Sequence, residues 1–222
     1  MSLDHELRAL AERGRSQAPA AVQAAMQTAQ QALVASGLAQ QALRPGQALP
    51  AFELPDADGR LLALSALLEQ GPVLLNFYRG QWCPFCNLAL RALQGHLPHF
   101  RRHGVQLVAV SPERPDHSLA LVQQHGLAFP LLTDAGLGLA RRCGIVFTLD
   151  EGLRPLYQAW GVDLPARNGN GSFELPLPAA FLVGRDGLVR EAFVEPDYRL
   201  RLEPDTALGW IDRHFGAGAV PG

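Results

Sequence analysis

Short apolar runs and helically spaced apolar residues alternate along most of this chain. The runs at 73–78 and 105–110 favour buried strands. In 87–97, leucines recur at helical spacing with polar residues between them. Strands that alternate with helices favour a parallel or mixed sheet with right-handed crossovers. The pattern therefore predicts an α/β fold in which helices flank one central mixed sheet.

Turn and capping residues indicate further elements. Polar, glycine-containing turns at 56–59 and 185–187 each separate two apolar runs, so each predicts a hairpin. Ser65 is expected to cap a short helix, and Asp134 is expected to cap another. Pro204 begins a predicted amphipathic helix near the end of the chain.

Residues 1–44 precede the alternating pattern and are rich in Ala, Gln and Leu. They predict an N-terminal helical extension of two helices that separate near Gly14 and Ser16. The apolar face of the second helix is weak but still needs something to pack on. We expect it to clamp its own domain, and a homodimer contact is the alternative. The main domain is expected to span 45–222.

Residues 148–176 interrupt the alternation inside this main domain. A helix is predicted for 153–160, and a polar, glycine-rich stretch follows at 165–172. Long insertions of this kind are often functional. Two interpretations stay open, a functional insertion and a solvated excursion without a role.

Composition narrows the classes of function. The chain has 222 residues, of which 48% are hydrophobic, and its 19 basic residues nearly balance 21 acidic ones. We therefore expect neither nucleic acid nor an anionic membrane as a partner. No apolar run approaches the roughly 18 residues that span a bilayer, and the charged N-terminal residues do not resemble a secretion signal. A cytoplasmic protein is expected, and three cysteines, an odd number, fit a reducing compartment.

Cys83 and Cys86 form a Cys-Pro-Phe-Cys motif between the strand at 73–78 and the helix that follows it. Unpaired N–H groups and the dipole at a helix start favour a thiolate, and Pro84 suits the first helical turn. A partner three residues on lies about one turn away, so the two sulfurs can join as a disulfide. We expect Cys83 to be the more acidic, attacking thiol and Cys86 to resolve it. Such a pair near a βαβ pattern is typical of a thioredoxin-like redox motif.

Other cysteine chemistry is less well supported. Cys83 and Cys86, with His99 and His103, match the spacing of a two-Cys two-His zinc finger. Such a finger carries its cysteines in a hairpin before its helix, whereas here the predicted helix begins at the cysteines, so no metal site is expected. Cys143 is expected to be a buried free cysteine of apolar character, with a resolving role as the alternative.

The sequence resembles the peroxiredoxin-like branch of the alkyl hydroperoxide reductase and thiol-specific antioxidant (AhpC/TSA) family, which has a thioredoxin-like fold. The resemblance runs from about 45 to 215, and the segments that carry it are 77–87, 109–113, 168–176, 178–183 and 197–204. It implies thiol chemistry on peroxides or disulfides.

The chain departs from typical peroxiredoxins in two ways. Their Pro-x-x-x-Thr-x-x-Cys spacing puts Arg79 at the proline, Cys83 at the threonine and Cys86 at the peroxidatic cysteine. This register favours Cys86 as the nucleophile, against the helix-start argument. Their arginine before the late strand is replaced by Pro-Ala-Ala at 178–180. That replacement is similar to thioredoxins, in which a cis-proline, here Pro178, faces the cysteine pair.

Four further residues are candidates for the site. Arg79 and Arg201 are candidates for the cation that stabilises a thiolate or polarises a peroxide, with an ion-paired or surface role as the alternative. Trp82 and Phe85 are expected either to shield the sulfurs and shape a docking surface or simply to pack in the core.

The resemblance implies an oxidoreductase without a metal or organic cofactor. In the first hypothesis, peroxide oxidises one thiol to a sulfenic acid, the other thiol condenses with it, and a thioredoxin- or glutathione-type donor reduces the resulting disulfide. In the second, the pair reduces disulfides of partner proteins and Pro178 contacts the substrate backbone. In the third, a non-catalytic redox sensor changes the shape of 148–176.

Overall fold

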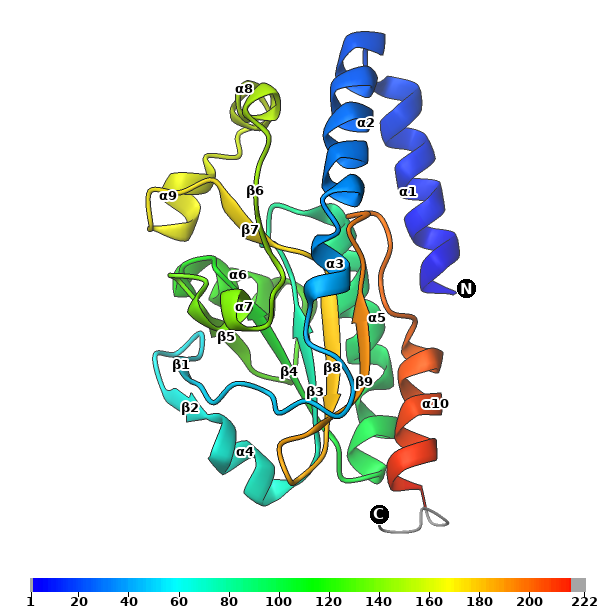
Figure 1. The fold of residues 1–222 in the computed structure, drawn as a ribbon, viewed down its shortest axis with the longest axis vertical. Helices are drawn as coiled ribbons and strands as arrows, with labels where there is room; N and C mark the ends of the chain where they lie inside the picture. Colours follow the sequence, from blue (N-terminus) through cyan, green and yellow to red (C-terminus); the bar gives the residue numbers. More distant parts are fainter. Residues whose placement is uncertain (1, 217–222) are drawn as a thin grey trace.

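A five-stranded mixed sheet forms the centre of the protein, as seen in a computed structural model that describes residues 2–216. The strand order is β5-β4-β3-β8-β9, with β3, β4 and β5 parallel and β8 and β9 antiparallel to their neighbours (Figure 1). The strands are β3 (Val73–Phe77), β4 (Gln106–Ser111), β5 (Leu131–Thr133), β8 (Ala179–Val183) and β9 (Val189–Val194). The predicted α/β fold with a central mixed sheet is therefore confirmed.

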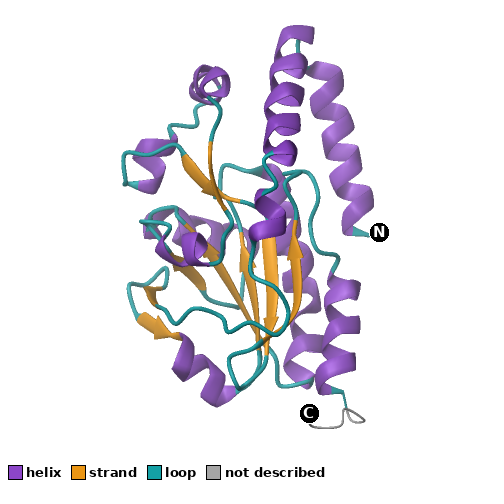
Figure 2. Cartoon of the chain, in the orientation of Figure 1, coloured by secondary structure: helices purple, strands orange, loops and turns teal. Residues whose placement is uncertain are grey.

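Strand β3 lies in the middle of the sheet and pairs with β4 on one side and β8 on the other. Its last residue, Phe77, is opposite Val110 and Ala179. All of its residues are buried, because helices and loops cover both faces of the sheet (Figure 2). A strand covered on both faces has a continuous apolar run rather than an alternating one.

The two faces of the sheet carry separate apolar cores. One core packs the sheet against α1 (Leu3–Gln17), α5 (Pro84–Arg102), α6 (Pro115–His125) and α10 (Pro204–Phe215). The other packs it against α4 (Leu64–Gln70), α7 (Gly138–Arg142) and the loop near 42–52. Among residues 2–216, no helix combines the length and apolar character needed to cross a bilayer.

The predicted hairpins are confirmed, but one predicted helix cap is wrong. β1 (Glu53–Pro55) and β2 (Leu61–Ala63) are antiparallel, as are β8 and β9. Ser65 lies inside α4, because β2 leads directly into that helix and Ala63 is at the N-cap. Asp134 does satisfy the start of α7, since its carboxylate accepts hydrogen bonds from the N–H groups of Leu139 and Ala140 at 3.2 and 2.9 Å.

The N-terminal extension contains α1, α2 (Ala20–Ala35) and the short α3 (Leu38–Gln41). The predicted break near Gly14 and Ser16 is wrong, since α1 continues through both residues and the chain turns before Pro19. Buried residues of α1 join the core around α5, whereas α2 has no buried residue. The domain boundary at residue 44 stays a prediction, and 217–222 of the predicted main domain lie outside the described residues.

Segment 148–176 is folded around a small core of its own rather than being a solvated excursion. Its ends belong to the antiparallel ribbon of β6 (Val146–Thr148) and β7 (Glu174–Pro176). Between them are a 3₁₀ turn at Glu151–Leu153, α8 (Arg154–Ala159) and α9 (Leu164–Asn168), so the predicted helix is present. Five buried side chains form the core and partly buried residues of α2 pack on it: Leu149, Leu153, Tyr157, Leu164 and Leu175.

Candidate active site

The cysteine pair lies where β3 gives way to α5. Cys83 is the N-cap of α5 in an extended conformation, Pro84 is the first helical residue, and Cys86 lies in the first turn. The N–H group of Cys86 donates to the carbonyl oxygen of Cys83 at 3.0 Å. Both cysteines are free thiols with 0% of their surface exposed. The predicted strand, turn and helix start are therefore all present, but the sulfurs are covered.

Two arginines converge on the two sulfurs. Arg79, in the turn after β3, donates from Nη2 to Cys83 Sγ at 3.1 Å. Arg201, from the loop between β9 and α10, donates from Nη2 to Cys86 Sγ at 3.1 Å and lies 3.9 Å from Cys83 Sγ. Within residues 2–216, neither guanidinium forms an ion pair with a carboxylate. A buried cation needs a counter-charge, and the sulfurs are the groups placed to supply it.

The surroundings shift the pKa values of the two thiols in opposite directions. Burial opposes the charged form of Cys86, but the hydrogen bond from the Cys83 thiol and the charges of Arg201 and Arg79 outweigh it and hold the Cys86 pKa well below its usual range. Burial, together with that same hydrogen bond, raises the pKa of Cys83 well above its usual range. These directions are opposite to the expectation that Cys83 is the more acidic thiol, and the identity of the attacking cysteine stays a prediction. Arg201 Nη2 lies closer to Cys86 Sγ than to Cys83 Sγ.

Aromatic rings surround Arg79. Its guanidinium carbon lies 5.0 Å from the Trp82 ring and 4.7 Å from the Tyr198 ring, and its Nη1 donates to the Tyr157 hydroxyl at 3.3 Å. The Phe85 ring meets Tyr198 edge-on at 5.4 Å. Trp82 and Phe85 thus contribute to an aromatic cover around Arg79, and both also pack in the core around α5. Sequence reasoning missed Tyr157 and Tyr198 as site residues, because no local spacing links them to the cysteine motif.

Pro178 does not adopt the expected conformation. Peptide bonds in the described part of the chain are all trans, so the expected cis-proline opposite the cysteines is a wrong prediction. Pro178 lines a cavity together with Arg79 and Tyr198, and its carbonyl oxygen accepts the N–H group of Glu195 at 3.0 Å. The likeness to the thioredoxin arrangement is therefore in sequence only.

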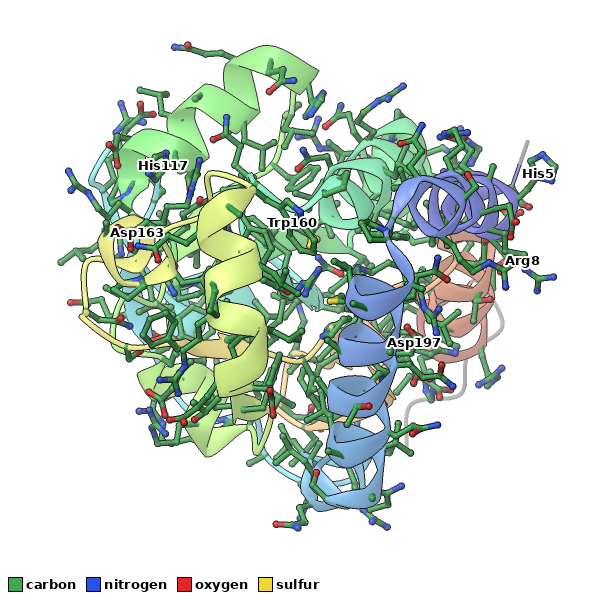
Figure 3. The ribbon with its side chains drawn as sticks, turned by 90° about the horizontal axis from the view of Figure 1, so that it is seen from above. His5, Arg8, His117, Trp160, Asp163 and Asp197 are labelled. Carbon is green, nitrogen blue, oxygen red and sulfur yellow. The ribbon has the colours of Figure 1, made fainter. Side chains whose placement is uncertain are left out.

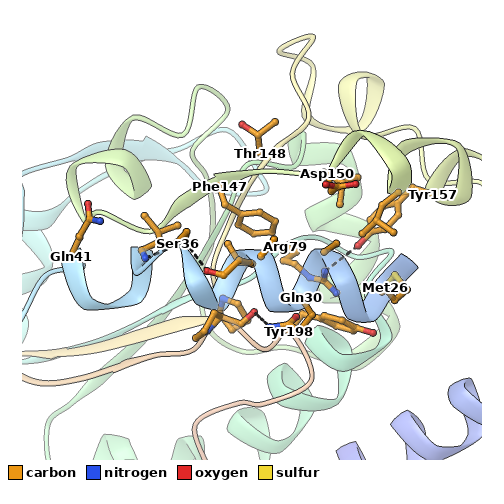
Figure 4. A pocket seen from close by; sticks show the side chains of 18 residues that line it. Met26, Gln30, Ser36, Gln41, Arg79, Phe147, Thr148, Asp150, Tyr157 and Tyr198 are labelled. Carbon is orange, nitrogen blue, oxygen red and sulfur yellow. Dashed lines mark hydrogen bonds between the residues drawn. The ribbon is translucent and has the colours of Figure 1, made fainter. Parts of the chain in front are cut away.

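Two cavities adjoin the cover. One, of about 420 Å³, lies between α2 and the start of the insertion, with Met26, Phe147, Tyr157 and Tyr198 among its walls (Figure 4). The other, of about 950 Å³, lies between the N-terminal helices and the rings of Trp82, Phe85 and Trp160, and it shares its Arg79, Tyr157 and Tyr198 walls with the first. Neither Cys83 nor Cys86 lines either of these two cavities. Both cavities therefore reach Arg79 but stop short of the sulfurs.

Cys143, His99 and His103 lie apart from the dithiol site. Cys143 is buried in the core on the other face of the sheet, as expected, and burial raises its pKa to about 12. His103 pairs with Asp212 at 3.3 Å, and His99 contacts Arg102 at 2.6 Å. No group of three or more potential ligands within 2–216 is arranged to hold a metal ion.

A buried dithiol at a helix start, beneath two arginines and on a mixed five-stranded sheet, defines a thiol-based oxidoreductase with a thioredoxin-like fold. A sequence model of the AhpC/TSA family matches residues 45–192. The chain therefore belongs to the AhpC/TSA family, whose members include peroxiredoxins.

Individual relatives agree with this assignment. The chain is 24% identical to peroxiredoxin Bcp of Escherichia coli K12, over 78% of this chain and 97% of that protein. It is 26% identical to the thiol-disulfide oxidoreductase ResA of Bacillus anthracis, over 71% of this chain and 74% of that protein. Its fold is similar to that of peroxidoxin BcpB from Mycobacterium tuberculosis, with a TM-score of 0.61 and 22% identity over 76% of this chain and 96% of that chain.

Proposed function

We propose that this protein is a thiol-dependent peroxide reductase that cycles between a dithiol and a disulfide at Cys83 and Cys86. The environment of Cys86 is the observation that carries the proposal, since its sulfur accepts a hydrogen bond from Arg201 at 3.1 Å and its pKa is held low. The thiolate is the nucleophilic form of cysteine. Cys86 is therefore the attacking residue, as the peroxiredoxin spacing favours, and Cys83 is the resolving residue.

The cycle needs no metal or organic cofactor. The Cys86 thiolate attacks one peroxide oxygen, the O–O bond breaks, and the departing alkoxide takes the proton of Cys83 and leaves as an alcohol. Cys86 is then a sulfenic acid and Cys83 a thiolate. Cys83 attacks the Cys86 sulfur, an S–S bond forms, and the released hydroxide takes a proton from solvent. Two electrons pass from the sulfurs to the peroxide.

Arg79 and Arg201 share a role in this cycle. Both guanidiniums donate toward sulfur in the reduced state, and donors in these positions also stabilise the negative charge that develops on the departing oxygen. Because the cysteines have 0% exposed surface, a peroxide reaches Cys86 only after the Arg79 and Tyr198 side chains shift. The cover formed with Trp82 thus excludes water between turnovers.

The disulfide must be reduced before another cycle. A thioredoxin- or glutathione-type thiol donor supplies the two electrons by thiol–disulfide exchange. Such donors maintain reduced thiols in the cytoplasm, which is the location we propose. A homodimer through the extension 1–44 stays a prediction.

Single-cysteine variants test the proposal. Reduced Cys83→Ser should react with hydrogen peroxide and retain a sulfenic acid that a dimedone-type probe traps, whereas Cys86→Ser should give no trapped product. If the wild-type protein consumed peroxide no faster than free cysteine does, the proposal would be contradicted. Trapping on Cys83 in Cys86→Ser, at the wild-type rate, would reverse the assigned roles.

Reduction of protein disulfides is a second candidate function. The Cys-x-x-Cys motif and the similarity to ResA favour it. The full burial of both sulfurs opposes it, because a protein disulfide needs an exposed nucleophile. The pair should reduce insulin no faster than free dithiothreitol does, and rapid insulin reduction without peroxide turnover would make this the function. A non-catalytic sensor is not favoured, since the family consists of thiol oxidoreductases.

A further inference from the structure

Glu113 is a completely buried carboxylate that the proposed cycle does not use. It follows β4 and has 0% of its surface exposed. Its Oε2 accepts the N–H group of Gln81 at 2.6 Å, and its Oε1 accepts Arg167 Nη1 at 2.9 Å. Its own backbone is held by Ser111 and Thr133 through hydrogen bonds of 2.9 and 3.2 Å. A buried charge with both oxygens bonded and a fixed backbone has a defined position.

The carboxylate fixes the turn that precedes the cysteines. Gln81 is held from both sides, because its N–H group donates to Glu113 and its carbonyl oxygen accepts Asn87 Nδ2 at 2.9 Å. The neighbouring Gly80 has a φ of +151°, and a Cβ there would lie 2.5 Å from Trp82 Nε1 and 3.1 Å from the Glu113 carboxyl carbon. The turn therefore packs directly on Glu113, and only glycine fits at residue 80.

The same turn carries Arg79, which donates from its side chain to Cys83 Sγ at 3.1 Å. The charge of Arg79 also lowers the pKa of Cys86. The N–H group of Cys83 closes the turn on the carbonyl oxygen of Gly80 at 3.1 Å. A shift of this backbone would displace Arg79 and Cys83 together.

The counter-ion of Glu113 comes from the insertion. Arg167 lies in α9, and its carbonyl oxygen accepts the N–H group of Arg114 at 3.0 Å. Asp163, which caps α9, and His117 of α6 lie on the same side of the molecule (Figure 3). Burial raises the pKa of Glu113, while the Gln81 N–H group and Arg167 oppose that shift. Arg167 therefore helps to keep the carboxylate charged.

We propose that Glu113 is a positioning residue for the dithiol and that Arg167 makes the insertion 148–176 part of this support. The pair acts through the turn at 79–82 on Arg79, whose guanidinium donates to Cys83 Sγ and whose charge favours the Cys86 thiolate. The insertion thereby tunes the acidity of a sulfur that it does not touch. The inference rests on the assignment of Cys86 as the thiolate, but it does not require that peroxide be the substrate.

Glu113→Gln and Arg167→Met test the proposal in the reduced full-length chain. Each variant should raise the pKa of Cys86, measured from the ultraviolet absorbance of the thiolate against pH, by about one unit, which corresponds to a tenfold change in ionisation. Sulfenic acid formation below that pKa should slow by roughly the same factor. Arg167→Lys keeps the charge and should restore most of the wild-type titration.

Arg141 and Glu174 provide the matched control. They form an exposed ion pair at 2.9 Å that also links the insertion to the main domain, but neither contacts the turn. Arg141→Met should leave the thiolate titration unchanged. If Glu113→Gln and Arg167→Met lower the melting temperature but titrate like the wild type, Glu113 is merely structural and the proposal is wrong.

Two further outcomes separate this proposal from the proposed function. Arg167 is partly exposed, with 25% of its side chain accessible, so its variants test the proposal even if Glu113→Gln does not fold. Shifted titrations in a protein that consumes no peroxide would support the positioning role and contradict the peroxidase. If Arg167→Lys and Arg167→Met gave the same pKa for Cys86, the charge of Arg167 would have no role.

Discussion

The dithiol and Cys143 are equally buried, yet their surroundings give them opposite chemistry. Cys83 and Cys86 have 0% of their surface exposed and Cys143 has 1%. Cys143 lies at the C-cap of α7, where helix carbonyl groups disfavour a thiolate, whereas the pair lies at the start of α5. Burial and the nearby Asp134 raise the pKa of Cys143 to about 12.

The difference shows that burial alone does not create a reactive cysteine. Desolvation disfavours the charged form at all three sites. Cys83 and Cys86 each accept a hydrogen bond from a guanidinium at 3.1 Å, and the charges of both Arg201 and Arg79 lower the pKa of Cys86. At Cys86 these donors reverse the sign of the pKa shift, since hydrogen bonds to the charged form favour it. Each variant below removes one part of this contrast.

The largest effect is expected from exchanging the cysteines themselves. Cys86→Ser should lower peroxide turnover by roughly a thousandfold or more, because it removes the nucleophile. Cys143→Ala should leave turnover at the wild-type value, since Cys143 belongs to the core on the opposite face of the sheet. Steady-state peroxide consumption with a thiol donor measures both. A large loss in Cys143→Ala with an unchanged melting curve would make Cys143 the resolving cysteine.

A smaller effect is expected from Arg201→Met. Without the Arg201 guanidinium, the pKa of Cys86 should rise by one to two units, with a loss of about 10–100-fold in sulfenic acid formation at neutral pH. In the wild type, a lowered pKa keeps Cys86 ionised as the pH falls, so the rate should decline only in acid. In the variant, the decline should begin at a higher pH than in the wild type. A stopped-flow pH–rate profile measures this shift.

Arg199→Met is the matched control for that experiment. Arg199 lies in the same loop but pairs with Asp197 at 2.7 Å instead of contacting a sulfur. Its replacement should leave the pH–rate profile in place. Equal shifts for the two arginine variants would mean that the loop as a whole, and not the Arg201 charge, controls Cys86.

The sequence predicts the features that depend on neighbouring residues and misses the contacts between residues far apart in the chain. The strand at 73–77 and the helix start at Pro84 follow from apolar periodicity and a proline preference, which are properties of neighbouring residues. The contact between Arg201 and Cys86 joins residues 115 positions apart, so no spacing rule reports it. The prediction for Cys83 rests on the helix start, which is local, whereas the Arg201 charge beside Cys86 comes from a distant loop.

The insertion and the extension show the same limit. The glycines and polar residues at 169–172 lie outside helices and strands, but 165–168 belong to α9. The buried leucines around Tyr157 become a core only when β6 and β7 pair. Gly14 predicts a break in the first helix, yet α1 runs through it. Packing of Leu3 and Leu7 on the core around α5 outweighs the modest helix penalty of one glycine.

Alkaline pH should reveal the raised pKa of Cys143 in the stability of the protein. An unfolded cysteine loses its proton near pH 8.5, whereas folded Cys143 keeps it until about pH 12. The folded state then binds more protons, so this residue should lower the free energy of unfolding by up to about 1.4 kcal/mol per pH unit above that point. Cys143→Ala should remove this contribution.

Urea unfolding at several pH values measures the slope. The chain contains no lysine, so its three cysteines and three tyrosines are the side chains that titrate between neutrality and pH 11. Comparison of the wild type with Cys143→Ala isolates the contribution of one of them. The lowered pKa of Cys86 acts in the opposite direction. Its contribution to the free energy of unfolding is fully present above the pKa of the unfolded thiol and is lost as the pH falls through the folded pKa. Identical slopes in the wild type and Cys143→Ala would contradict the raised pKa.

The smallest effect is expected from Tyr157→Phe, which tests how far the support of the dithiol extends. The substitution removes the hydroxyl that accepts Arg79 Nη1 at 3.3 Å, while the rings of Trp82 and Tyr198 continue to hold the guanidinium. Loss of one neutral acceptor should slow sulfenic acid formation by about two- to threefold. A tenfold loss in the rate of sulfenic acid formation would mean that Tyr157 contributes about as much as Arg201. The expected order follows from distance, because Arg201 touches the thiolate itself and Tyr157 touches only the arginine that touches Cys83.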